Sequence, residues 1–216
     1  MSNEARPLDD LLDQLKRGDE QALAELFSLH RQRLWRIAHF RLDARLHGRV
    51  DADDVLQEAY LNAAQRIRHF VSDSSTSLFV WLRLIVGQTL IDVHRRHLGA
   101  QMRDAGREVA LGGHGGGQTT SMSLAACLLG HVTSPSQAAV RAETSAQLEA
   151  ALESMDPIDR EVLALRHFEE LSNSEVAEVL EIQQKAASIR YVRALKRLKG
   201  VLCRLPGFSS DGRNGD

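Results

Sequence analysis

The sequence has little of what usually marks secreted, membrane-spanning or sheet-rich proteins. Its 216 residues include only 2 cysteines, Cys127 and Cys203, which form no paired motif, so we expect reduced thiols rather than a disulfide framework. Aromatic residues make up 5% of the chain, which is few for a sheet-rich protein. The longest apolar stretch, residues 78–86, is interrupted by Arg83 and is too short to cross a bilayer. The polar, acidic N-terminus does not resemble a signal peptide. We therefore expect a cytoplasmic protein without membrane insertion.

An excess of charge of one sign is also missing, because 27 basic and 29 acidic residues leave a formal net charge of −2. The net charge therefore gives no case for nucleic-acid binding, and any such case must come from how charge is distributed along the chain. What the sequence does contain is a hydrophobic fraction of 43%, together with abundant leucine, alanine, arginine and glutamate. These residue types favour helices. The length allows one large helical domain or two small ones.

The spacing of apolar residues divides the chain into parts. Over residues 1–98 nearly every stretch has helical periodicity, and the same pattern returns over residues 136–205. Residues 99–135 show little periodicity and include a glycine-rich run that no Gly-Lys-Ser/Thr follows, so a phosphate-binding loop is disfavoured there. We predict an all-α fold of two helical domains, joined by a flexible linker over 99–135 and followed by a disordered tail over 206–216.

Helix-start signals in the second domain predict a helix-turn-helix. Asp156 followed by a proline is typical of a helix N-terminus. Ser172 and Glu175 have the spacing of a capping box, in which each side chain accepts a hydrogen bond from the other residue's backbone. The short helix that follows is expected to turn at Glu181, and a longer helix is expected from about Gln183. Two helices that meet at such a tight turn form the DNA-binding motif.

Positive charge is concentrated on the last of these helices. No acidic residue lies between Gln183 and Arg204, whereas the preceding helices are acidic. The N-terminal half of such a helix enters the major groove, where Gln, Lys and Arg can pair with base edges, and more distal cations are better placed for phosphates. The DNA-binding residues predicted here are Gln184, Lys185, Ser188, Arg190, Arg193, Lys196 and Arg197. The apolar stripe of the helix is predicted to be Ala187, Tyr191, Ala194, Leu195 and Leu198. A solvated basic face is the alternative, and the cap, turn and charge segregation together disfavour it.

A second exposed stripe is predicted on the helix that begins near Asp51. Asp54, Gln57, Glu58 and Leu61 follow one another at i, i+3, i+4 and i+7, on the side opposite the apolar positions. An acidic stripe that ends in an exposed leucine suits a protein partner with a basic surface. Taken alone, the same stripe would be an ordinary solvated helix face.

Three segments in this order, DADDVLQEAYLNA, WLRLIVGQTLIDVHRR and DREVLALRHFEELSNSEVAEVL, resemble bacterial sigma factors of the extracytoplasmic-function (ECF) group. The resemblance covers nearly the whole chain except the expected linker. It implies that the first domain binds the clamp helices of core RNA polymerase and opens the downstream (minus-ten) promoter element. It also implies that the last domain reads the upstream (minus-thirty-five) element of promoter DNA. In many members an anti-sigma factor masks these surfaces, which makes such an inhibitor a candidate partner.

The resemblance implies roles for particular residues. Those that it places on the polymerase clamp are Asp54, Gln57, Glu58 and Leu61. Those that it places on the non-template strand of the downstream element are Arg83, Gln88, Arg95 and Arg96. The chemistry agrees, because arginine neutralises phosphates and glutamine can hydrogen-bond a base edge. We expect Trp81 to be a core residue or a partial wedge, and Asp92 to have a structural role.

The sequence departs from the family pattern at several positions. Glu170 and Glu181 stand where the family usually has glycine, before the capping serine and in the turn. A positive φ at either glutamate would cost roughly 1 kcal/mol. Gln88 replaces a commoner asparagine and Ser188 a commoner lysine, and both changes alter the promoter sequence that the family pattern would predict.

Two other classes of function compete with a sigma factor. A stand-alone helix-turn-helix regulator would need neither the acidic stripe nor the segment from Trp81 to Arg96. An enzyme would need a catalytic constellation, and none stands out. His94 and His97 lie three residues apart without a nearby cysteine or set of carboxylates, so they make a poor metal site. We therefore expect no catalysis, no metal and no cofactor.

Overall fold

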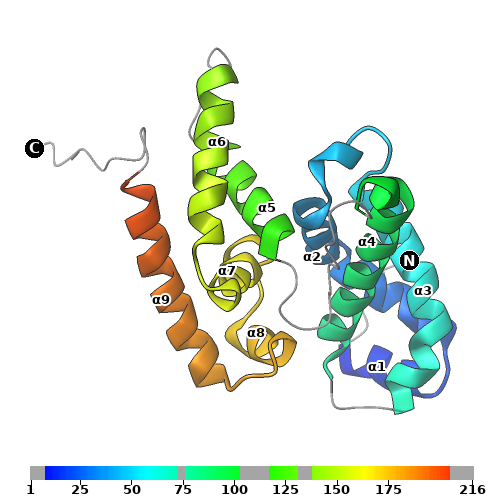
Figure 1. The fold of residues 1–216 in the computed structure, drawn as a ribbon. Coiled ribbons are helices and arrows are strands. Elements are labelled where there is room, and N and C mark those ends of the chain that lie inside the picture. Colours follow the sequence, from blue (N-terminus) through cyan, green and yellow to red (C-terminus); the bar gives the residue numbers. More distant parts are fainter. Residues whose placement is uncertain (1–7, 73–75, 103–116, 131–137, 205–216) are drawn as a thin grey trace, which may run out of the picture. The chain divides into compact units, whose positions relative to one another are not determined.

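The structure is a computed structural model that describes residues 8–72, 76–102, 117–130 and 138–204. Over these residues it contains helices and turns and no strand, which confirms the predicted all-α fold (Figure 1). The chain divides into two compact units, Met1–Arg107 and Glu108–Asp216. Within the described ranges, no helix is both long and apolar enough to cross a membrane.

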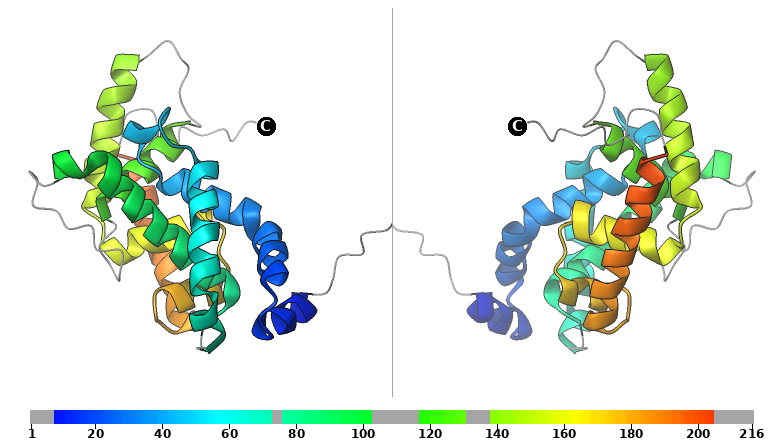
Figure 2. Two further views of the ribbon diagram at one scale, coloured as in Figure 1. Left: turned by 90° about the vertical axis from the view of Figure 1, so that its right-hand side faces the viewer. Right: turned by 90° about the vertical axis from the view of Figure 1, so that its left-hand side faces the viewer.

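The first unit is a bundle of helices arranged around α2. Its elements are α1 (Leu8–Lys16), α2 (Glu20–Arg41), the short 3₁₀ helix η1 (Ala44–Leu46), α3 (Ala52–Ser72) and α4 (Leu78–Met102). Helix α2 contacts α1, α3 and α4, and α3 also packs along α4 (Figures 1 and 2). The almost fully buried side chains of its core include Leu23, Leu26, Leu34, Ile37, Val55, Ala59, Leu82 and Val86. Each buried leucine stabilises the bundle by about 2 kcal/mol, and the helix faces opposite this core remain exposed.

The junction of α1 and α2 shows how local sequence sets these boundaries. Gly18 has a φ of 90°, a backbone conformation that glycine adopts without strain, and its N–H donates to the carbonyl of Leu15 at 2.9 Å. Asp19 then caps α2, because its carboxylate accepts a hydrogen bond from the N–H of Gln21 at 2.9 Å. The glycine ends one helix and the aspartate begins the next.

The second unit carries the predicted helix-turn-helix. Its elements are α5 (Gly117–Gly130), α6 (Ala138–Glu153), α7 (Pro157–Leu163), the π-helical turn η3 (Ala164–Phe168), α8 (Asn173–Val179) and α9 (Gln184–Leu202). Helix α5 packs on α6 and α7, while α9 contacts α6, α7 and α8 (Figure 1). The buried side chains at the centre of this unit include Leu124, Leu129, Leu148, Leu152, Val162, Leu163, Leu165 and Val176.

The prediction of a flexible linker over residues 99–135 is wrong in two places. Helix α4 continues to Met102, and residues 117–130 form α5, in which Leu124, Ala125 and Leu129 are buried. Helix α5 shows no clear periodicity because its second half is apolar on nearly all sides, so it lacks the alternation that reveals an amphipathic helix. The remaining parts of the expected linker, and the expected disordered tail over 206–216, lie outside the described residues.

Candidate nucleic-acid interface

The helix-turn-helix begins and turns as the sequence predicts. Asp156 caps α7, accepting a hydrogen bond from the N–H of Ile158 at 2.9 Å. The capping box of α8 is complete: the N–H of Glu175 donates to Oγ of Ser172 at 3.2 Å, and the N–H of Ser172 donates to Oε2 of Glu175 at 2.7 Å. These bonds satisfy backbone donors that the first turn of a helix leaves without partners. They fix the start of α8, the first helix of the motif.

Both glutamates that replace family glycines have positive φ. The φ of Glu170 is 56° and that of Glu181 is 52°. Glu181 lies just after α8, where the N–H of Ile182 donates to the carbonyl of Ala177 at 2.9 Å and closes the C-terminal turn of the helix. A side chain with a Cβ atom is strained in this left-handed region. The turn therefore has a backbone conformation that favours glycine, although glutamate occupies the position.

Replacing Glu181 by glycine is expected to raise the free energy of unfolding by about 1 kcal/mol, because it removes this strain. Urea-induced unfolding followed by circular dichroism would measure the change. The matched control is Glu181→Ala, which removes the carboxylate but keeps the Cβ atom and so should bring no comparable gain. A glycine variant no more stable than the alanine variant would contradict the prediction.

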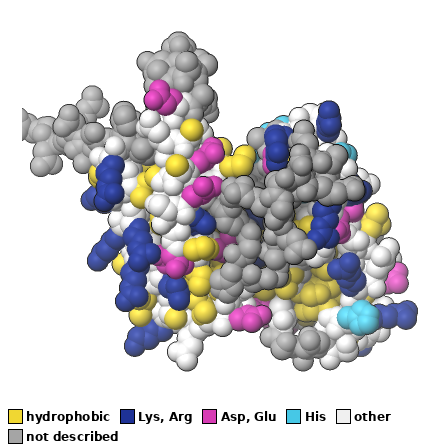
Figure 3. All heavy atoms as spheres, in the orientation of Figure 1, with side chains coloured by type: hydrophobic (Ala, Val, Ile, Leu, Met, Phe, Trp, Pro, Cys, Tyr) yellow, Lys and Arg dark blue, Asp and Glu magenta, His cyan; other side chains and the backbone are white. Residues whose placement is uncertain are grey.

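The outward face of α9 carries most of the predicted DNA-binding residues. Ala187 and Ala194 are buried against the rest of the unit. On the face drawn in Figure 3, lysine and arginine side chains gather over α9, with apolar side chains between them. The predicted residues Gln184, Lys185, Arg193 and Lys196 are exposed on this helix.

Three predicted residues of α9 are either partly buried or already paired within the second unit. Ser188 is half-buried, and its Oγ accepts a hydrogen bond from Nδ2 of Asn173 at 2.7 Å, which joins α8 to α9. Arg197 forms an ion pair with the buried carboxylate of Asp159 on α7, at 2.6 Å from Nη1 to Oδ2. Arg190 is half-buried. Ser188 and Arg197 have partners on neighbouring helices because α9 packs against both α7 and α8, although the side chain of Arg197 is still 57% exposed.

The predicted apolar stripe of α9 needs one correction as well. Ala187 and Ala194 are buried and Tyr191 and Leu198 are half-buried, but Leu195 is 37% exposed. Sequence reasoning also missed two exposed apolar residues on the outward face, Ile189 and Val192. Their helical spacing from Lys185 could have revealed them.

In the first unit, the predicted acidic stripe lies on α3 beside a shallow pocket. Asp54, Gln57 and Leu61 are exposed, and Leu61 has 56% of its surface accessible. Asp54 also has a structural role: its carboxylate accepts from the N–H of Asp51 at 3.0 Å, while the N–H of Asp54 donates to the Asp51 carboxylate at 2.8 Å. This reciprocal pair begins α3. Glu58, the remaining residue of the stripe, is half-buried.

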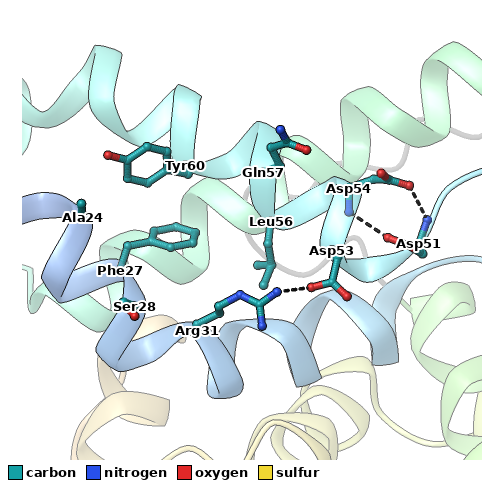
Figure 4. A pocket seen from close by; sticks show the side chains of 10 residues that line it. All are labelled: Ala24, Phe27, Ser28, Arg31, Asp51, Asp53, Asp54, Leu56, Gln57 and Tyr60. Atoms are coloured by element: carbon teal, nitrogen blue, oxygen red, sulfur yellow. Dashed lines mark hydrogen bonds and ion pairs between the residues drawn. The ribbon is translucent and has the colours of Figure 1, made fainter.

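The pocket of about 430 Å³ between α2 and α3 combines charged and aromatic walls (Figure 4). Arg31 on α2 forms an ion pair with Asp53 on α3, and Nε1 of Trp35 donates to the same carboxylate at 3.2 Å. Phe27 and Tyr60 meet edge to face, with their ring centroids 5.3 Å apart. Because Asp54 and Gln57 also line it, the pocket belongs to the same surface as the acidic stripe.

The predicted downstream-DNA residues of α4 are only partly exposed. Arg95 is exposed, and Gln88 is half-buried with its Nε2 3.5 Å from the carboxylate of Asp92. Arg83, which was predicted to neutralise phosphates, is buried in this structure, with 8% of its surface accessible. It lies in the middle of an apolar run that packs into the bundle.

Two further features define the exposed face of α4. Trp81 is half-buried, with its ring centroid 4.8 Å from that of Phe70, which agrees with a core residue that reaches the surface. Leu84 is 48% exposed and was missed by the sequence reasoning. Because Trp81, Leu84 and Gln88 follow at i, i+3 and i+7, they lie on one face with Arg95.

An ion pair connects the two predicted surfaces of the first unit. Nη2 of Arg96 on α4 lies 2.5 Å from Oε2 of Glu58 on α3, and both side chains are partly exposed. Arg96 was predicted to bind DNA and Glu58 to bind polymerase. In the free protein these side chains satisfy each other, because α3 and α4 pack side by side.

His94 has a structural role on α4. Its Nε2 accepts a hydrogen bond from the backbone N–H of Asp43 at 3.3 Å, and burial lowers the pKa of His94, which favours the neutral, accepting imidazole. The hydrogen bond from Arg45 lowers the pKa of the Asp43 carboxyl. These contacts anchor the chain after α2 on α4. In the part of the chain that the structure describes, no group of three or more histidine, cysteine or acidic side chains could hold a metal ion.

One helical unit carries a helix-turn-helix whose last helix is basic, and the other has exposed acidic and apolar helix faces. Together these features define a DNA-binding transcription factor. The chain belongs to the ECF sigma factor family, whose model matches residues 6–199. This finding confirms the resemblance seen in the three sequence segments.

Similar proteins agree with this assignment. The chain is 25% identical over 191 residues to the ECF RNA polymerase sigma factor SigW of Bacillus subtilis, a match that covers 88% of this chain and 94% of that protein. It is 26% identical over 197 residues to the RNA polymerase sigma-H factor of Pseudomonas aeruginosa, covering 89% and 92%. The structure of CnrH in complex with the cytosolic domain of CnrY has the same fold, with a TM-score of 0.51, 21% identity, and coverage of 92% and 99%.

Proposed function

We propose that this chain binds core RNA polymerase through α3 and directs it to promoters whose upstream element is read by α9. The observation that carries the proposal is the family match over residues 6–199, which spans both units and therefore both surfaces. The protein supplies recognition and needs no catalytic group of its own, because the polymerase carries out the chemistry. Its place of action is then the cytoplasm, together with polymerase and DNA.

The polymerase surface is proposed to consist of the exposed face of α3 and the pocket beside it. Asp54, Gln57 and Glu58 supply acceptors and negative charge, while Leu61 supplies an exposed apolar contact. Interfaces usually combine such an apolar contact with a polar surround, and complementary charge speeds association with the right partner. A basic surface on the clamp helices of polymerase fits this chemistry.

The DNA surfaces are proposed to lie on both units. On α9, Gln184 is suited to base edges, and Lys185, Arg193 and Lys196 to bases or phosphates. On α4, Gln88, Arg95 and the neighbouring Trp81 are suited to unpaired bases and their phosphates, and Arg96 joins them when it leaves Glu58. Each surface alone is small, so we expect weak binding to free DNA. Polymerase would hold both units near their promoter elements and raise the effective concentration of each.

A protein inhibitor is a further part of the proposal. CnrH, which shares the fold, was solved in complex with the cytosolic domain of CnrY. The exposed leucines at 29, 61 and 84 in the first unit offer apolar contacts for a partner of this kind.

Reconstitution from purified components tests the proposed function. The chain is mixed with core RNA polymerase and a library of genomic fragments, and the transcripts are mapped. We expect discrete start sites that require both the chain and core polymerase, and co-elution of the two on a sizing column. Failure to bind polymerase, with DNA binding that polymerase does not strengthen, would instead identify a stand-alone helix-turn-helix regulator.

A further inference from the structure

The centre of the outward face of α9 is apolar. Ile189 is 43% exposed and Val192 is 51% exposed, although both are branched aliphatic residues. They lie between Lys185 and Lys196 in one stripe, at i, i+4, i+7 and i+11. Ala187 and Ala194, which are buried, mark the opposite side of the helix. Two aliphatic side chains therefore lie on the face of α9 with which a recognition helix contacts DNA.

The chemistry of these side chains limits what they can recognise. Neither Ile189 nor Val192 can donate or accept a hydrogen bond, so they cannot pair with the polar edges of bases. The one apolar group that the major groove displays is the C5-methyl group of thymine. The occupant must also tolerate surrounding cations, because no acidic side chain lies on α9 and its exposed basic residues flank the stripe. DNA satisfies both conditions, with methyl groups inside the groove and phosphates along its rims.

On the basis of the proposed function, we propose that Ile189 and Val192 contact thymine methyl groups in the upstream promoter element and determine a preference for thymine there. The two residues are three positions apart, which corresponds to about 4.5 Å along the helix axis. Successive base pairs are about 3.4 Å apart, so the two side chains reach neighbouring base pairs or base pairs separated by one. The preferred thymines should show the same spacing.

The test uses the complex of the full chain with core RNA polymerase and a promoter library randomised in the upstream element. Enriched sequences reveal whether thymine is selected. Each enriched thymine is then replaced by deoxyuridine, which lacks only the methyl group. We expect one or two of these replacements to weaken binding about fourfold each, the value of one buried methyl group.

Variants assign the methyl contacts to particular side chains. In the Ile189→Ala or Val192→Ala variant, replacing the contacted thymine by deoxyuridine should no longer weaken binding, because the side chain that contacts the methyl group is gone. Both residues are exposed, so the variants should fold. The matched control is Leu195→Ala, an exposed apolar residue on another side of the same helix, which should keep the wild-type sensitivity to deoxyuridine.

The outcomes separate this inference from the function on which it rests. If an upstream sequence is enriched but deoxyuridine does not weaken binding, the inference is overturned and the proposed function stays intact. The same holds if deoxyuridine weakens binding equally in both alanine variants. A protein partner would then be the occupant of this face. Absence of any enriched upstream sequence overturns both the reading function of α9 and the inference.

Discussion

In the Glu58→Lys variant, we expect the affinity for core RNA polymerase to fall by about tenfold to a hundredfold, because a lysine there would repel a basic surface on the polymerase. Glu58 lies in the centre of the proposed polymerase surface and is already held by Arg96 at 2.5 Å. A lysine would remove negative charge from the surface and leave two cations next to each other. A binding titration with labelled core polymerase measures the change.

Two controls separate the interface effect from the loss of the ion pair. Glu58→Gln breaks the pair without reversing the charge, and a partly exposed pair of this kind contributes no more than about 1 kcal/mol to stability. Asp10→Lys makes the same charge change on α1, an exposed position outside the stripe. We expect both controls to bind polymerase more tightly than Glu58→Lys. If Asp10→Lys weakens binding equally, net charge rather than the α3 surface determines the affinity.

The Glu58–Arg96 pair also bears on why the free protein should bind DNA weakly. Glu58 neutralises part of the charge of Arg96, and a basic residue of polymerase that pairs with Glu58 would free Arg96 to contact a phosphate. Polymerase binding and downstream DNA binding would then favour each other through one shared ion pair. The coupling free energy is small for a partly exposed ion pair. It would therefore add to the gain that comes from polymerase holding both units near their promoter elements, without replacing that gain.

Local patterns in the sequence predicted the local structure well. The capping box needs only Ser172 and Glu175, three residues apart, and the structure confirms both of its hydrogen bonds. The positive φ of Glu181 follows from the position of a turn within a recognised motif. Such features depend on residues close together in the chain, so a sequence without coordinates contains nearly all of the information about them.

The partners of individual side chains could not be predicted in the same way. Arg197 and Asp159 are 38 residues apart, and only the packing of α9 on α7 brings them together. The packing of α9 on α8 likewise makes Ser188 an acceptor for Asn173. Helix α5 was missed for a different reason: a helix that is apolar on nearly all sides has no polar face to reveal its period. Exposure along a helix depends on what the fold packs against it.

Arg197 is paired with Asp159, whereas Lys185 and Arg193 are exposed cations on the outward part of α9. We expect the Lys185→Ala/Arg193→Ala double variant, bound to core polymerase, to lose about tenfold to a hundredfold in affinity for a selected promoter at low salt. If both side chains neutralise phosphates, the slope of log affinity against log salt should fall by about 2, since each phosphate contact contributes about 0.9. Filter binding or fluorescence anisotropy between about 50 and 200 mM salt would measure the slope.

Arg197→Ala is the control on the same helix, and it removes one positive charge where the double variant removes two. Its guanidinium is paired with Asp159, whose side chain is only 6% exposed. Loss of that partner leaves a buried carboxylate and should lower the free energy of unfolding by about 2 kcal/mol, while the salt slope stays close to that of the wild-type protein. The double variant should show the reverse: a reduced slope and nearly unchanged stability. Equal slopes for wild-type protein and double variant would show that Lys185 and Arg193 do not neutralise phosphates, and a reduced slope for Arg197→Ala would show that Arg197 leaves Asp159 when DNA binds.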